Sequence, residues 1–282
     1  MTMKHRLVAF LIIAAILSVF VTGCGQEDTN VTEPVEFTQP VFSFSSLTTQ
    51  VPVNPGMLHN AILAQMGAAS IEPGSIESIV EFATLFRTAV NNALAPYGPS
   101  RLVTKDECLL GLSLGRLIDP LYDLSFTDET RLDPSDVIDF WRGSELFTTA
   151  ELDQVEAMLA APSGSEALAM ASTIELDPES DAVAAAASVF NASMFYWSTS
   201  GPSTTGCADD YENCVHTLRR TIGDSLGGML GALMGGPIAA GIVGCSLSVI
   251  FTINEGSYPP SGDHTGLPPA PCGGYHGVGP CP

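Results

Sequence analysis

The sequence has few basic residues. It contains 10 Lys and Arg against 31 Asp and Glu, for a formal net charge of −21 at pH 7. Nucleic acids and anionic lipid headgroups are bound through positively charged patches, so the scarcity of basic residues argues against both as partners. Convincing strand alternation is missing as well, and so are internal repeats, apart from one regular spacing of glycines. We therefore expect an all-α fold with an acidic, well-hydrated surface.

Little in the sequence is typical of an enzyme. One G-x-S-x-G match runs from Gly111 to Gly115 around Ser113. A hydrolase elbow needs a strand before the serine, whereas the capping box from Thr104 to Glu107 predicts a helix there. Two of the three histidines downstream fall in the Pro- and Gly-rich tail: His216, His264 and His276. A serine hydrolase is a remote alternative, and we expect no enzymatic activity and no cofactor.

Metal-binding patterns are also missing. No window between Asp128 and Asp139 has the alternate ligands, central glycine and terminal glutamate of a calcium loop. The tail contains four potential zinc ligands but lacks the C-x2-C spacing of structural zinc sites. These four are His264, Cys272, His276 and Cys281. We expect no metal site.

The N-terminus has the features of a secretory signal. Lys4 and Arg6 precede an apolar run from Leu7 to Val21, which is too short and too close to the terminus for a membrane span. Removing this leader takes away two of the 10 basic residues, which leaves eight against 31 acidic ones, a net charge near −23.

The apolar run ends in Val21-Thr22-Gly23-Cys24, which resembles the lipobox of bacterial lipoproteins. The resemblance covers the leader alone. It implies cleavage before Cys24, diacylglycerol on the sulfur and usually a further acyl chain, such as palmitate, on the amine. Several acyl chains anchor a protein stably where one would not. The alternative is a plain signal peptide with a chance cysteine.

The residues after Cys24 bear on the membrane to which the protein is sorted. In lipoproteins with a sorting rule of this kind, Gly25 in place of aspartate favours the outer membrane over retention in the inner membrane. Gln26-Glu27-Asp28 resembles the acidic surface-export tag of some lipoproteins, so display on the cell surface and on the periplasmic face both stay open.

Six of the seven cysteines are left once Cys24 is assigned to the lipid. An even number in an exported chain suggests disulfide bonds, although six cysteines allow many pairings. We favour Cys207–Cys214 and Cys272–Cys281 as local pairs and Cys108–Cys245 as a long-range one. The first pair requires a helix that starts after Cys207, because two cysteines seven residues apart in one helix are too distant.

The most informative stretch is glycine-rich and runs from Ile222 to Ile253. Glycines four residues apart form a row on one face of a helix, and a second row of small residues follows them. A face without side chains lets another helix backbone approach closely. We predict two apolar helices broken at Gly235-Gly236-Pro237 that form a hairpin. The expected packing glycines are Gly223, Gly227, Gly231, Gly235, Gly236 and Gly244.

This hairpin could be buried in protein or in lipid. Leu226 to Ile253 has no charged residue, and as one helix it would span about 42 Å, longer than the ~30 Å hydrocarbon core. Its glycines and Pro237 weaken membrane insertion, and each half is too short to span alone. We favour burial at the centre of an all-α domain. Membrane insertion is the alternative, because the glycine row resembles the glycine-zipper segments of membrane-inserting and pore-forming proteins.

The sequence therefore predicts four parts: a signal peptide (1–23), a lipidated flexible tether (24–52), an all-α domain (53–255) with the hairpin at 222–253, and a disordered tail (256–282). Within the domain, we expect His59 to cap a helix or lie at the edge of the core. The His59-Asn60 pair together with the glycine-rich end resembles uncharacterised bacterial envelope lipoproteins, which implies no activity. We expect a non-enzymatic binding or structural lipoprotein, attached to the membrane by its anchor and with a protein as a possible partner.

Overall fold

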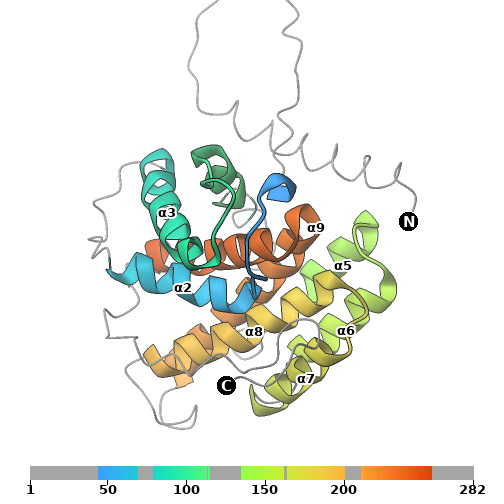
Figure 1. Ribbon diagram of the computed structural model, residues 1–282. Helices are drawn as coiled ribbons and strands as arrows, with labels where there is room; N and C mark the ends of the chain where they lie inside the picture. Colours follow the sequence, from blue (N-terminus) through green and yellow to red (C-terminus); the bar gives the residue numbers. More distant parts are fainter. Residues whose placement is uncertain are drawn as a thin grey trace, which may run out of the picture.

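The computed structural model describes residues 44–68, 79–112, 114, 135–161, 164–200 and 211–255. Within these ranges the chain is helical, and its β-type pairing is one isolated bridge between Thr49 and Pro99. The all-α prediction is confirmed. The elements are η2 (Phe44–Ser46), α2 (Pro55–Ala68), α3 (Ile79–Leu94), η3 (Ala95–Tyr97), α5 (Ser135–Ser144), α6 (Thr149–Leu159), α7 (Gly164–Leu176), α8 (Asp181–Ser200) and α9 (Tyr211–Glu255), with a further helical stretch at 105–112 (Figure 1).

Helix starts follow the capping signals of the sequence. The Thr148 hydroxyl accepts a hydrogen bond from the backbone N–H of Glu151, and the Glu151 carboxylate accepts one from the backbone N–H of Thr148. Thr104 and Glu107 make the same reciprocal pair at the start of the 105–112 helix. Each pair satisfies backbone donors that the first turn of a helix leaves free. The capping box predicted from Thr104 to Glu107 is confirmed.

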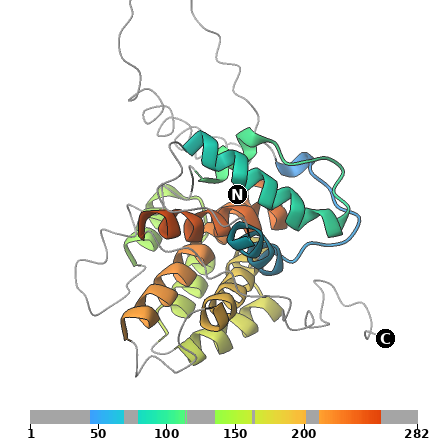
Figure 2. The same ribbon diagram turned by 90° about the vertical axis from the view of Figure 1, so that its left-hand side faces the viewer.

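α9 is broken where the sequence predicts. The backbone leaves helical geometry at Gly235 and at Gly236, and Pro237 opens the next helical segment. Gly236 has φ 70° and ψ −155°, a conformation that is essentially restricted to glycine. We call residues 211–234 the first arm and residues 237–255 the second arm, and Figure 2 shows them as separate orange and red segments.

The two arms separate two apolar clusters. The first cluster joins α5, α6, α7 and α8 to the first arm through side chains such as Trp141, Phe190 and Leu226. The second joins η2, α2, α3 and the 105–112 helix to the second arm through side chains such as Phe86 and Ile242. α9 packs most extensively against α8 and α2. The hairpin therefore contributes buried side chains to both apolar clusters and lies between them.

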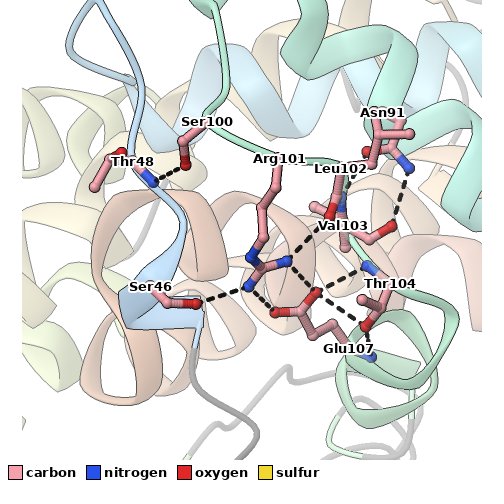
Figure 3. Close-up of polar contacts among 9 residues, drawn as sticks. All are labelled: Ser46, Thr48, Asn91, Ser100, Arg101, Leu102, Val103, Thr104 and Glu107. Carbon is pink, nitrogen blue, oxygen red and sulfur yellow. Dashed lines mark hydrogen bonds and ion pairs between the residues drawn. The ribbon is translucent and has the colours of Figure 1, made fainter.

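The segment before α2 belongs to this core. Phe44 and Leu47 are 1% and 5% exposed, although the sequence assigns them to the flexible tether. Arg101 links this segment to the start of the 105–112 helix. Its guanidinium donates hydrogen bonds to the Ser46 hydroxyl (3.0 Å) and to both carboxylate oxygens of Glu107 (Figure 3). The folded part of the chain thus starts before residue 53, while residues 1–43 and 256–282 lie outside the described ranges.

By length and composition alone, Arg220–Ser246 could cross a membrane. Its mean hydropathy is 1.7. A buried core helix passes the same test, and 67% of this apolar window is covered by the rest of the protein. The stretch also contains the break at Gly235 and Gly236, so it is not one straight helix.

Candidate functional site

A fully enclosed group of polar side chains lies where α2, α8 and both arms of α9 meet. Its members are between 0% and 4% exposed. We call it the polar cluster, and it consists of His59 and Asn60 from α2, Ser193 from α8, Thr221 and Asp224 from the first arm and Ser248 from the second arm.

Asp224 is the centre of this cluster. Its Oδ1 accepts a hydrogen bond from the backbone N–H of Ser248 (3.0 Å), and its Oδ2 accepts from the Ser248 hydroxyl (2.6 Å). The Ser193 hydroxyl donates to the same Oδ2, also at 2.6 Å. Because Ser248 and Asp224 are on different arms, this one carboxylate ties the open end of the hairpin together and attaches it to α8.

His59 adds the only basic side chain of the cluster. Its Nε2 lies 2.9 Å from Oδ2 of Asp224, which is an ion-pair distance, although the ring N–H does not point along that line as a hydrogen bond requires. Its Nδ1 lies 2.8 Å from Oδ1 of Asn60, whose Nδ2 donates to the Ala192 carbonyl. Both ring nitrogens therefore face acceptors.

The same residue types make catalytic triads, but the connections here are different. In a triad the serine hydroxyl donates to the histidine, and the carboxylate holds the other ring nitrogen. In this cluster both serines donate to the carboxylate, and Asn60 accepts from the other ring nitrogen. His59 and Asp224 are 0% exposed. The arrangement holds helices together and offers no nucleophile to a substrate.

Next to the polar cluster, the arms meet without side chains between them. A Cβ added to Gly227 would lie 2.9 Å from the Val243 carbonyl oxygen and 3.0 Å from the Gly244 Cα. One added to Gly231 would overlap the Ala239 carbonyl, and one added to Gly244 would lie 2.9 Å from the Asp224 carbonyl oxygen. Partners closer to the break on one arm are closer to it on the other, as in an antiparallel hairpin. We call Gly227, Gly231 and Gly244 the glycine seam.

The other glycines singled out from the sequence have different surroundings. Gly223 is buried in the first arm. A Cβ on Gly235 would overlap the Phe44 side chain, whereas Gly236 has open space around it and is required for its positive φ. Sequence spacing did not indicate three further close contacts: Gly56 against Ser188, Gly228 against Val189 and Gly241 against Pro55 and Leu58. Close backbone approach thus extends from the hairpin to α8 and α2.

The predicted Cys108–Cys245 disulfide is wrong for this structure. Both residues are buried free thiols in the second apolar cluster. Burial raises the pKa of Cys108 to about 12 and raises that of Cys245 well above its ordinary value, so neither readily forms the thiolate that disulfide formation needs. The remaining cysteines, Cys24, Cys207, Cys272 and Cys281, lie outside the described ranges, as does the side chain of Cys214.

The G-x-S-x-G match also lies in a helical setting. Residues 105–112 are helical, so the strand that a nucleophile elbow needs is not there. Gly111 packs against the second arm, where an added Cβ would be 3.3 Å from Ile242 and from Ser246. Ser113, His264 and His276 lie outside the part of the chain that the structure describes, as does the side chain of His216. Among the described residues, no group of three or more His, Cys, Asp or Glu could hold a metal ion.

Comparisons of the chain with protein-family models, with curated proteins and with solved structures found no match.

Proposed function

We propose that the protein is an envelope-anchored lipoprotein whose all-α domain is a non-enzymatic binding or structural module. The observation that carries this proposal is the closed state of the polar cluster. Its histidine, aspartate and serines are bonded to one another and are 0% exposed. Residues used in this way stabilise one arrangement of helices and are not available to a substrate.

The sequence supports the proposed location at the cell envelope. The lipobox ending at Cys24 provides the anchor, and Gly25 favours the outer membrane as the destination. The excess of 31 acidic over 10 basic residues makes a protein a better partner than a nucleic acid. The membrane contact in this proposal is made by the acyl chains, while the hairpin stays inside the domain.

Metabolic labelling tests the anchor. Cells of a bacterium with an outer membrane are grown with an alkyne-tagged palmitate, and the protein is isolated after expression of the wild type or of Cys24→Ala. We expect the label on the wild type, in the outer-membrane fraction, and none on the variant. Equal labelling of both chains, or an unlabelled wild type in the soluble fraction, would refute lipid anchoring at Cys24.

A second candidate is a membrane-inserting protein that uses the hairpin, and the length and mean hydropathy of Arg220–Ser246 favour it. Leakage of a dye from anionic and zwitterionic liposomes separates the two candidates. The mature chain with Cys24→Ser is used, so that acyl chains do not contribute. Binding without leakage, or no binding, supports the first candidate, whereas leakage that Gly231→Leu abolishes supports the second.

A further inference from the structure

The turn of the hairpin reaches the surface of the protein, unlike its arms. We call residues 232–237 the hairpin tip. Leu233 is 37% exposed, and Pro237 is exposed as well. Leu230 and Ala239, just before and just after the tip, are 2% and 0% exposed. The apolar side chains of α9 are therefore covered along the arms and open to the outside at the turn.

The hairpin tip is uncharged, although the protein has 31 acidic residues. No Asp, Glu, Lys or Arg occurs between Leu226 and Ile253, and η2, which lies beside the tip, has the sequence Phe-Ser-Ser. An exposed apolar surface on an otherwise well-hydrated protein marks a place of contact with a partner or a membrane. Because the tip has no basic residue, its apolar side chains are what it offers to a partner.

The chain enters the described part of the protein next to this tip. Phe44 is the first described residue, and a Cβ added to Gly235 would overlap its side chain. Figure 1 shows η2 beside the end of α9 that contains the turn. Phe44 is only 1% exposed, so packing in the core fixes this entry point. The 20 residues from Cys24 to residue 43 can span at most about 70 Å. A lipid anchor at Cys24 therefore pulls on the end of the domain that carries the tip.

We propose that the hairpin tip rests on the bilayer to which Cys24 is anchored and thereby orients the domain on the membrane. This inference rests on the lipid anchor of the proposed function. Leu233 and Met234 enter the interfacial layer, while both arms stay packed inside the domain. The bilayer surface is one rich in zwitterionic headgroups, because an acidic protein is repelled by anionic ones.

The anchor and the tip contribute different things to this contact. A few apolar side chains bind a bilayer weakly, so the tip alone does not hold the protein on a membrane. Tethering makes the second contact intramolecular, with an effective concentration on the order of millimolar. The acyl chains thus supply the attachment, and the tip supplies the orientation that a tether does not.

Tryptophan quenching by lipid tests the contact. The mature chain carries a polyhistidine tag in place of Cys24 and is bound to phosphatidylcholine vesicles that contain a nickel-chelating lipid. The domain is then tethered at the same point whether or not cells acylate Cys24, so a failed anchor and a failed tip give different results. Leu233→Trp is compared with Leu176→Trp, since Leu176 is 88% exposed at the end of α7, on the other side of the molecule from η2 (Figure 1).

Brominated acyl chains in the vesicles should quench the emission that Leu233→Trp adds by about two-fold, because a side chain at the headgroup boundary lies within reach of the bromine atoms. They should leave the emission that Leu176→Trp adds unchanged. The native Trp141 and Trp197 are present in both variants and are 2% and 4% exposed, so their signal is common to the comparison. Equal quenching in the two variants, or no quenching of Leu233→Trp, would overturn the proposal.

Hydrogen exchange tests the same contact without a substitution in the domain. The tagged chain is compared free in buffer and tethered to the same vesicles, and exchange is read by mass spectrometry. We expect the peptide that contains residues 232–238 to exchange more slowly on vesicles, while α7 exchanges at the same rate in both states. Unchanged exchange at the tip would contradict the proposal. Tip protection that rises with protein concentration in buffer would assign the surface to a second copy of the chain and would also overturn it.

Discussion

The two arms of α9 are held together in two different ways within a few turns of each other. At the glycine seam the backbones touch because nothing lies between them, and the contact depends on what the residues lack. At the polar cluster the arms are joined by Asp224 and Ser248, and the contact depends on particular atoms in particular places. An added side-chain atom at the glycine seam would clash with the other arm. Removal of a side chain from the polar cluster would instead leave a buried polar group without its hydrogen-bond partner. The two regions should therefore respond in opposite ways to substitutions that remove atoms and to those that add them.

The largest effect should come from Asp224→Ala. This change removes the acceptor of three hydrogen bonds in the core and leaves the buried His59 ring without its acidic partner, so we expect a loss of about 3–5 kcal/mol in the free energy of unfolding. Urea denaturation followed by circular dichroism measures it. Asp153→Ala is the control, because Asp153 is 61% exposed and pairs with Arg142 at the surface, where such a pair is worth about 1 kcal/mol or less. Similar losses in the two variants would show that the cluster is not a buried charge site.

Ser248→Ala is the next test on the cluster side. It removes the hydroxyl that donates to Oδ2 of Asp224 but keeps the backbone N–H that donates to Oδ1. A hydrogen bond to a charged group contributes about 1.5–3 kcal/mol, and we expect a loss in that range. Ser172→Ala, in which an exposed hydroxyl loses only its bond to the Leu168 carbonyl, should change stability by less than about 0.5 kcal/mol.

On the seam side, Gly231→Ala adds one methyl group where the Ala239 carbonyl already lies. The arms must move apart, at a cost of about 1–3 kcal/mol, although alanine favours a helix over glycine. Gly143→Ala adds the same group to α5 with nothing within 4 Å, so it should cause no loss and a gain of up to about 1 kcal/mol. A stabilising Gly231→Ala would mean that the arms do not touch at this point.

These contrasts also explain what the sequence could predict. The glycine rows and the Gly-Gly-Pro break predicted a hairpin because spacing along one helix is enough to place small residues on one face. The capping box from Thr104 to Glu107 predicted a helix start for the same local reason. The polar cluster could not be predicted, because it depends on the register between α2 and α9, which are far apart in the chain. Asp224 itself was a signal, as an acid beside a long uncharged stretch, but its partners His59 and Ser193 were not identifiable.

For the cysteines, the sequence predicted a contact that the structure does not contain. Their even number suggested disulfides, yet Cys108 and Cys245 lie in apolar surroundings as free thiols. Counting residues says nothing about whether two sulfur atoms meet. In the same way, composition assigned residues 44–52 to the tether, although Phe44 fills the space beside Gly235. Both predictions were wrong because they used residue counts and composition, which do not show which side chains pack together in the folded protein.

The smallest expected effect lies outside the hairpin, at Glu107. Burial acts to raise the pKa of this carboxyl group, but hydrogen bonds from Arg101 and Thr104 outweigh it and lower the pKa. A lowered pKa stabilises the fold above the unfolded value of about 4.3, and this contribution disappears as the pH falls through the folded value. Glu107→Gln should therefore cost about 1 kcal/mol or less at pH 7. The difference from the wild type should shrink toward pH 3 in denaturation curves, and a difference that grows in acid would contradict the assignment.

The central claim is that the two arms of α9 meet backbone to backbone inside the protein. An NMR experiment on a chain labelled with ¹³C-glycine tests this contact in aqueous buffer, with Gly227→Ala used to assign the signals. We predict a strong nuclear Overhauser effect between the α protons of Gly227 and Gly244, because a Cβ at Gly227 would lie 3.0 Å from the Gly244 Cα. A folded protein without that cross-peak, or one in which it appears only after lipid is added, would contradict the account.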